Sequence, residues 1–247
     1  MRSGLVQGVR TLLLLGLIMV AGCSSKGCAS KLVGSSLSPG VMTSLSITGD
    51  KPIDVIRAPS GVKRVVVYLH GRCEKTDITN KEWTAEASKV AHLILLQGDT
   101  ACAGTAYHEW TRDVAVVDAR VEAAVAALAA AIPGQVDTSA LIIAGYSEGA
   151  KRVSSLGARR PDRYNRAIMI GAPEAPTTAE LGKAKAVVTM AGEKDRHDLM
   201  LQGVSTLSAA KVPAKFMVLP GTDHGFFGPQ GGRVMREAIE WISATAP

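Results

Sequence analysis

The sequence predicts an α/β fold with a mostly parallel central sheet and helices on both of its faces. Short apolar runs such as Arg64–Leu69 and Ala140–Gly145 alternate along the chain with longer segments of helical pattern. Continuous apolar strands of this kind occur in parallel sheets that are buried on both faces. Apolar residues make up 47% of the 247 residues and charged residues 20%, so the chain is globular and has the length of one sizeable domain.

The expected elements begin near residue 41. β-Branched and apolar runs predict strands at Val41–Thr48, Ile53–Ala58, Arg64–Leu69, Val90–Leu96, Ala140–Gly145, Arg166–Ile170, Ala184–Ala191 and Lys215–Leu219. Helical length or amphipathic spacing predicts helices at Val114–Ile132, Glu148–Leu156, His197–Ala210 and Arg233–Ala244. Functional groups in such a sheet lie in the loops at the carboxyl ends of the strands.

Residues 1–22 have the layout of a secretory signal peptide. Arg2 and Arg10 precede the apolar run Thr11–Gly22, which is shorter than the roughly 20 residues that span a membrane. The run ends in Val20-Ala21-Gly22-Cys23, which resembles the lipobox of bacterial lipoproteins. The resemblance implies export and a lipid on Cys23, with ordinary cleavage nearby as the alternative. Ser24 stands where an Asp would retain a lipoprotein at the inner membrane, which favours the outer membrane.

Residues 23–40 are rich in Ser, Gly and Lys and predict a flexible tether, followed by a domain at 41–247. Removing residues 1–22 takes away two of the 28 basic residues and none of the 22 acidic ones, which leaves a net charge of +4. The basic residues are scattered, and the densest group is Arg159, Arg160, Arg163 and Arg166. No basic stripe or known module indicates a nucleic-acid partner. A solvated surface, or weak attraction to anionic lipid, remains open for this group.

Ser147 is the candidate nucleophile. It lies in Gly145-Tyr146-Ser147-Glu148-Gly149, after the apolar strand Leu141-Ile142-Ile143 and before a predicted helix. Gly-x-Ser-x-Gly is a weak pattern alone, but this strand–turn–helix setting is that of a nucleophile elbow. The amide of Glu148 at the helix start is placed to stabilise an oxyanion.

Four motifs occur in one order along the chain: His70-Gly71-Arg72, the elbow, Gly192-Glu193-Lys194-Asp195 and Asp223-His224-Gly225. Together they resemble the α/β-hydrolase superfamily over residues 41–247. They are most similar to its small esterases without a lid, such as dienelactone hydrolases and carboxylesterases. The dienelactone hydrolases carry Cys at the elbow and this chain carries Ser147, so the resemblance does not imply their specific reaction.

The resemblance implies a catalytic triad. His224 would be the base, because it follows the last strand and the family places acid and then His after the Ser. Asp195 would be the acid that orients the imidazole, with Asp198 and Glu193 as alternatives. His197 is interpreted as a surface residue.

The resemblance also implies that the second oxyanion donor is the backbone amide of Arg72, beside that of Glu148. His70 is then structural rather than a base. Cys73 and Cys102 follow strands that are neighbours in the family sheet, which implies a disulfide between them and leaves Cys28 free.

The expected reaction is ester hydrolysis through an acyl-enzyme on Ser147, on a small-molecule ester or amide and without a cofactor. Peptide or amide cleavage by the same residues, or a binding lipoprotein without catalysis, remains open. No metal-ligand spacing is present. Only about 13 residues separate the strands near Ile170 and Ala184, too few for a cap domain, which favours short acyl groups. Trp83, Tyr107 and Trp110 could line the pocket or simply pack in the fold.

Overall fold

The computed structural model describes residues 37–74 and 81–247. The predicted signal peptide, Cys23, Cys28 and the tether up to residue 36 lie outside the described residues. Residues 37–40, assigned above to the tether, pack on the domain instead. Leu37 is buried, Arg57 donates a hydrogen bond to its carbonyl, and Pro39 pairs with Arg57 in a β-bridge. The domain therefore begins before residue 41, because burying Leu37 removes its apolar side chain from water.

The strands of the described residues form a sheet in the order β1-β2-β4-β3-β7-β8-β9-β10. Neighbouring strands from β4 to β10 run parallel, and β1 and β2 add an antiparallel edge. The predicted mostly parallel sheet is confirmed. The strands span β1 (Met42–Leu45), β2 (Ile53–Ile56), β3 (Val65–Leu69), β4 (His92–Leu96), β7 (Ile142–Tyr146), β8 (Arg166–Ile170), β9 (Ala186–Gly192) and β10 (Ala214–Leu219).

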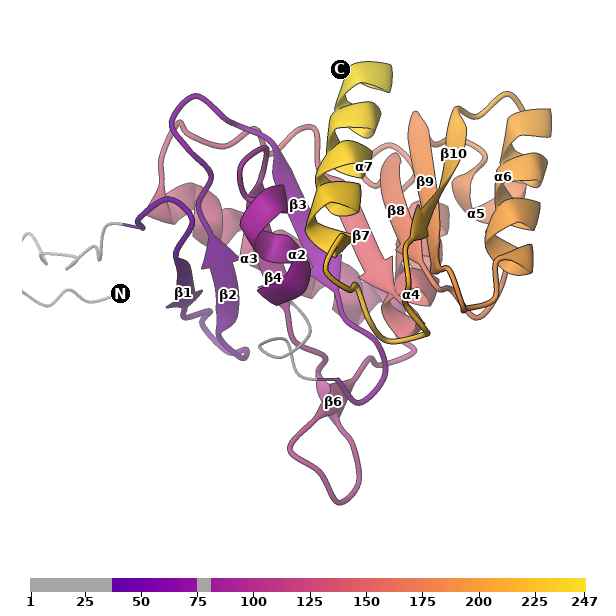
Figure 1. The fold of residues 1–247 in the computed structure, drawn as a ribbon. Helices are drawn as coiled ribbons and strands as arrows, with labels where there is room; N and C mark the ends of the chain where they lie inside the picture. The colour runs from indigo at the N-terminus through magenta and orange to yellow at the C-terminus, as the bar shows by residue number, and fades with distance from the viewer. Residues whose placement is uncertain (1–36, 75–80) are drawn as a thin grey trace, which may run out of the picture. The chain divides into compact units, whose positions relative to one another are not determined.

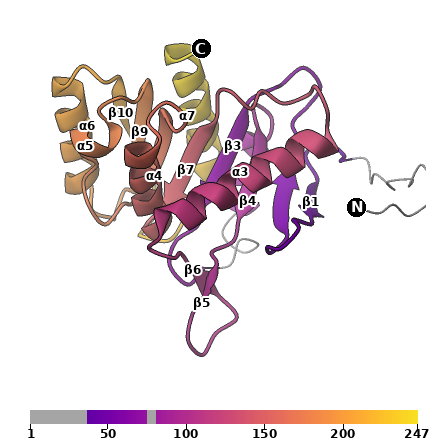
Figure 2. The same ribbon diagram turned by 180° about the vertical axis from the view of Figure 1, so that it is seen from behind.

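Helices cover both faces of the sheet. α2 (Lys81–Ala87) and α7 (Gly231–Thr245) pack on one face (Figure 1), and α3 (Val114–Ala131) and α4 (Glu148–Arg159) lie on the other (Figure 2). α5 (Thr178–Leu181) and α6 (Asp198–Ala209) share the second face. Each face has its own apolar layer, so the β strands are buried on both sides. None of these helices has both the length and the apolar character needed to cross a bilayer.

Two small elements escaped the sequence pattern. α2 is only seven residues long, and it places Trp83 fully inside the layer beneath α7. β5 (Thr100–Ala101) and β6 (His108–Glu109) form a hairpin that projects from the carboxyl-end edge of the sheet (Figure 1). Two-residue strands show no alternation that a sequence pattern could reveal.

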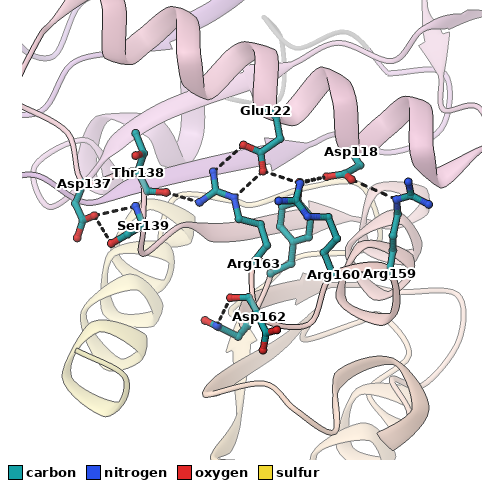
Figure 3. A network of polar contacts seen from close by, with 11 residues as sticks. Asp118, Glu122, Asp137, Thr138, Ser139, Arg159, Arg160, Asp162 and Arg163 are labelled. Carbon is teal, nitrogen blue, oxygen red and sulfur yellow. Dashed lines mark hydrogen bonds and ion pairs between the residues drawn. The ribbon is translucent and has the colours of Figure 1, made fainter.

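The densest arginine group joins α3 to the end of α4. Arg160 lies 3.0 Å from both Asp118 and Glu122, and Arg163 contacts Glu122 at 2.6 Å (Figure 3). Burial opposes ionisation of Asp118, but hydrogen bonds from Tyr164 and Arg160 outweigh it and hold its pKa below the usual value. Arg166 donates instead to the carbonyls of residues 246 and 247. The group is therefore engaged within the protein rather than simply solvated.

Candidate active site

Ser147 stands on a strained turn between β7 and α4. Its backbone has φ +50° and ψ −112°, which L-residues with a side chain rarely adopt. A Cβ on Gly149 would lie 2.0 Å from the carbonyl oxygen of Leu69, so glycine allows α4 to begin against the end of β3. The Ser147 amide donates to the carbonyl of Ile170 at 2.8 Å, which ties the turn to β8. This is the geometry expected of a nucleophile elbow.

Two loops from the end of the sheet bring His224 and Asp195 to Ser147. The Nε2 atom of His224 lies 3.1 Å from the Ser147 hydroxyl, and its Nδ1 lies 2.8 Å from Oδ2 of Asp195. Protonation of Nδ1 satisfies the carboxylate and leaves Nε2 as an acceptor for the hydroxyl. The Asp195 side chain is 10% exposed and the His224 side chain 49%, so the imidazole stays within reach of solvent.

The alternative residues lie elsewhere. Asp198 is exposed and faces Arg196 at 3.7 Å, and Glu193 accepts a hydrogen bond from the Gly221 amide. His197 contacts the carbonyl of Gly192 at 2.5 Å and packs on Phe216. None of these three has a recorded contact with Ser147 or His224 in the described part of the chain. Asp195 is thus the carboxylate that the fold places on His224.

Gly171 and Tyr146 support the His224 loop, and the sequence reasoning missed both. A Cβ on Gly171, whose φ is +52°, would lie 3.1 Å from both Asp195 Oδ2 and His224 Cε1. The Tyr146 hydroxyl accepts a hydrogen bond from the Gly225 amide at 2.6 Å, and its ring meets His224 edge-on. Burial raises the pKa of Tyr146 to about 12, so the phenol keeps its proton. The only hint in the sequence was the position of Tyr146 beside the nucleophile and of Gly171 at a strand end.

The loop after β3 passes beside the nucleophile. A Cβ on Gly71 would lie 3.6 Å from the Cβ of Ser147, which places the next amide, that of Arg72, near the hydroxyl. Among the described residues, neither the Arg72 amide nor the Glu148 amide has a recorded acceptor. Two unpaired N–H groups that flank a nucleophile are what an oxyanion hole requires.

Contacts on both sides hold this loop in place. Cys73 and Cys102 form a disulfide with a Cα–Cα distance of 5.7 Å, and this joins the loop to the β5–β6 hairpin. The Gly71 amide donates to the Glu74 carboxylate at 2.7 Å. Cys73 has φ +51°, a left-handed conformation that these contacts maintain.

His70 is a structural residue, as expected. Its Nε2 accepts a hydrogen bond from the Gly98 amide at 2.7 Å, and its Nδ1 lies 2.6 Å from the carbonyl of Gly71. Burial lowers the pKa of His70 to about 4, so the ring is neutral at physiological pH. It links the loop after β3 to the loop after β4.

Ser147 lies between two hollows. The larger, of about 770 Å³, is lined by charged side chains, and the smaller, of about 200 Å³, lies on the His224 side. Pro173 borders both. Trp83 and Trp110 line neither, because both are buried in the core, and Tyr107 is exposed. Of the two alternatives left open for the tryptophans, packing in the fold is therefore the one observed, because their large apolar rings are buried against the sheet.

One group of potential metal ligands occurs in the described part of the chain. Ligand atoms of Cys73, Cys102 and Glu109 lie within 4.8 Å of one another. The two sulfurs are joined to each other, however, and a disulfide supplies no thiolate to an ion. The group therefore does not fit a metal.

Comparisons with known proteins bear on the family and the fold of this chain. A model of the dienelactone hydrolase family matches residues 55–243, whereas no curated protein sequence matches the chain. FphF, a fluorophosphonate-binding serine hydrolase of Staphylococcus aureus, superposes with a TM-score of 0.60 at 17% identity. The match covers 83% of this chain and 99% of the FphF chain. One of two fungal esterases from Rhizomucor miehei superposes with a TM-score of 0.60 at 14% identity. That match covers 83% of this chain and 83% of the esterase chain.

An uncharacterised protein from Bacillus cereus also superposes, with a TM-score of 0.61 at 17% identity. The match covers 76% of this chain but only 62% of that longer one. At such identities these solved structures are evidence for the α/β-hydrolase fold alone.

Proposed function

This chain belongs to the dienelactone hydrolase family, and from that premise we propose that it hydrolyses carboxylic esters through an acyl-enzyme on Ser147. The proposal rests on one observation above all. The Ser147 hydroxyl contacts the His224 imidazole at 3.1 Å, and the imidazole contacts the largely buried Asp195 carboxylate at 2.8 Å. The unit needs all three groups, because a serine hydroxyl is a weak nucleophile until a base accepts its proton.

Acylation begins when Ser147 Oγ attacks the ester carbonyl and its proton passes to Nε2 of His224. The carbonyl oxygen becomes an oxyanion, which the amides of Arg72 and Glu148 stabilise. The imidazolium, oriented and stabilised by Asp195, then gives its proton to the departing alcohol. The C–O bond of the ester breaks, and the acyl group stays on Ser147.

Deacylation repeats the sequence with water. His224 takes a proton from a water molecule, whose oxygen attacks the acyl carbon. The second oxyanion collapses, the proton returns to Ser147, and the carboxylic acid leaves. Ser147 replaces the Cys found at the elbow of the dienelactone hydrolases, so the lactone reaction itself is not part of the proposal.

Short acyl groups are the proposed preference. Residues 171–185 between β8 and β9 contain only α5, a helix of four residues, and so provide no cap at this position. A long acyl chain needs an apolar wall, since each buried methylene contributes about 0.8 kcal/mol. Six of the eight residues that line the larger hollow are charged, and Pro173 supplies its apolar side chain, so a long acyl chain would lie among charged groups.

Labelling with a fluorescent fluorophosphonate tests the mechanism. Wild-type protein should be labelled and should hydrolyse p-nitrophenyl butyrate, whereas Ser147→Ala should do neither. His224→Ala should be nearly as inactive, because the triad acts as a unit. Ser205→Ala, an exposed serine on α6, is the matched control and should behave as wild type. Full activity of Ser147→Ala would refute the assignment.

The same assay distinguishes the other candidates. Cleavage of p-nitroanilides in preference to esters would indicate an amidase or peptidase with the same residues. A folded wild-type protein that is neither labelled nor active would instead indicate a non-catalytic binding protein.

We also propose export and a lipid anchor on Cys23, in the outer membrane of a bacterium. The support is the sequence Val20-Ala21-Gly22-Cys23 after an apolar run. Several acyl chains anchor a protein stably, while one binds only weakly. Cys23→Ser should leave the precursor unprocessed or the protein released from membranes. Wild-type protein that fractionates as soluble, with no lipid mass on its N-terminal peptide, would contradict the anchor.

A further inference from the structure

The larger hollow beside Ser147 carries an excess of positive charge. Its cations are Arg72, Arg112, Lys151 and Arg152, and its anions are Glu148 and Glu174. The smaller hollow on the other side of Ser147 has one of each, Arg196 and Asp195. The two sides of the nucleophile therefore differ in charge.

Contacts within the protein neutralise the larger hollow only in part. Lys151 forms an ion pair with Glu174, which accounts for one cation and one anion. Glu148 is shared at longer distance, 3.5 Å from Arg152 and 3.9 Å from Arg72. Arg72 also lies 3.7 Å from Glu109.

Two arginines keep donor capacity. The side chain of Arg152 is 9% exposed, and its buried Nε has no hydrogen-bond acceptor in the described part of the chain. Arg112 is exposed, and none of the ion pairs among the described residues includes it. A guanidinium presents paired N–H donors that match the two oxygens of a carboxylate.

The position of His224 assigns each hollow to one part of the ester. The imidazolium must reach the oxygen of the departing alcohol to protonate it, so the alcohol lies on the His224 side. His224, Asp195 and Leu199 line the smaller hollow. The acyl part then extends across Ser147 into the larger, cationic hollow.

Building on the proposed function, we propose that the enzyme prefers esters whose acyl group ends in a carboxylate, with Arg112 as the residue that binds it. Arg152, whose side chain is largely buried, and Arg72, whose side chain is exposed, add positive potential to the same hollow. The substrate class is the half-ester of a dicarboxylic acid, with the charge on the acid side and a small neutral alcohol.

A matched pair of esters tests the charge alone. One is the mono-p-nitrophenyl ester of adipic acid, whose second carboxyl is free, and the other is its methyl ester, which is neutral. We expect kcat/KM to be about tenfold higher for the charged ester, the ratio that corresponds to one partly solvated charge-assisted hydrogen bond. The ratio should shrink toward one at about 1 M salt, where the screening length is only about 3 Å.

Variants test the residue. Arg112→Gln should reduce the charged-to-neutral ratio to near one. Because Arg112 is exposed and forms no ion pair with the described residues, we expect the variant to fold as wild type does. Arg233→Gln is the control, because this arginine lies on α7 and pairs with Glu237. It should leave the ratio as in wild type.

A second pair of esters tests the side of the charge. The butyrate ester of p-hydroxybenzoic acid carries its carboxylate on the alcohol, and that of methyl p-hydroxybenzoate is neutral. The kcat/KM values of these two esters should differ little, and Arg112→Gln should not change the ratio between them.

The outcomes separate the two proposals. If the neutral ester is cleaved in a Ser147-dependent reaction but the charged adipate ester is cleaved no faster, the carboxylate preference is refuted and the esterase stands. An unchanged ratio in Arg112→Gln, or a preference for charge on the alcohol, also refutes it. If neither ester is cleaved, both proposals fail.

Discussion

Replacing Gly171 with Ala tests whether the packing behind the triad sets its rate. Gly171 follows β8, and its φ of +52° lies in the left-handed region. An added Cβ would lie 3.1 Å from Asp195 Oδ2 and 3.1 Å from His224 Cε1, closer than a methyl group normally approaches either atom. The substitution replaces one hydrogen by a methyl group and changes no triad side chain.

Two separate costs follow from that geometry. The left-handed backbone costs roughly 1–2 kcal/mol for a residue with a Cβ, which lowers stability. The crowding must displace the Asp195–His224 pair by a few tenths of an ångström. Because a misplacement of 1 Å costs about 100-fold in rate, we expect kcat to fall about tenfold.

Gly134→Ala separates the two costs. Gly134 has φ +73°, but a Cβ there would have no atom within 4 Å. Both variants should therefore lose similar stability in thermal unfolding, by about 2–4 °C for each kcal/mol in a domain of this size. Only Gly171→Ala should lose kcat for p-nitrophenyl butyrate.

The comparison of the two variants decides the matter. Wild-type kcat in Gly171→Ala would show that the pair tolerates the methyl group and would refute the reasoning. An equal loss of kcat in Gly134→Ala would attribute the effect to general destabilisation instead.

Three further results are expected. Cys73→Ser should lower the free energy of unfolding by about 3–4 kcal/mol, which is the chain-entropy value for closing a loop of this length. Peptide mapping of the wild-type protein under non-reducing conditions should recover Cys73 bound to Cys102. A free Cys73 thiol in exported protein would contradict the disulfide. Burial lowers the pKa of His70 from 6.5 to about 4, so the unfolded chain binds more protons between these values. Stability should fall as the pH drops through that window, and His70→Gln should remove this part of the pH dependence; identical urea midpoints for the two proteins at every pH would exclude it. Acetyl and butyryl esters should be cleaved with higher kcat/KM than dodecanoyl esters below their micelle threshold, and an optimum at the longer chain would reveal an apolar channel.

Most of the architecture could be predicted from local pattern. The strands near Val65–Leu69 and Ile142–Tyr146 are apolar on both faces, so their runs are visible in the sequence. The elbow was recognisable because its glycines, its serine and the following helix lie within a few residues. The β5–β6 hairpin and α2 were missed, because elements of two to seven residues carry almost no periodicity.

The choice among carboxylates needed the tertiary structure. Asp195 and Asp198 are the same residue type three positions apart, so no local pattern distinguishes them. Only the path of the loop after β9 brings Asp195, and not Asp198, into contact with His224. Gly171 and Tyr146 were invisible as supports, because their contacts join segments that are far apart along the chain.

The sequence by itself determined the strands and helices, because these depend on neighbours along the chain. The order of the candidate nucleophile, acid and base came from the resemblance of four motifs to the α/β-hydrolases. Only the tertiary structure decided that Trp83 and Trp110 fill the core and that arginines occupy the hollow beside Ser147. The physical reason is that burial and electrostatic potential at a point are sums over every nearby group. Arg72, Arg112 and Arg152 come from three different segments, and no local pattern records that the fold brings their charges together.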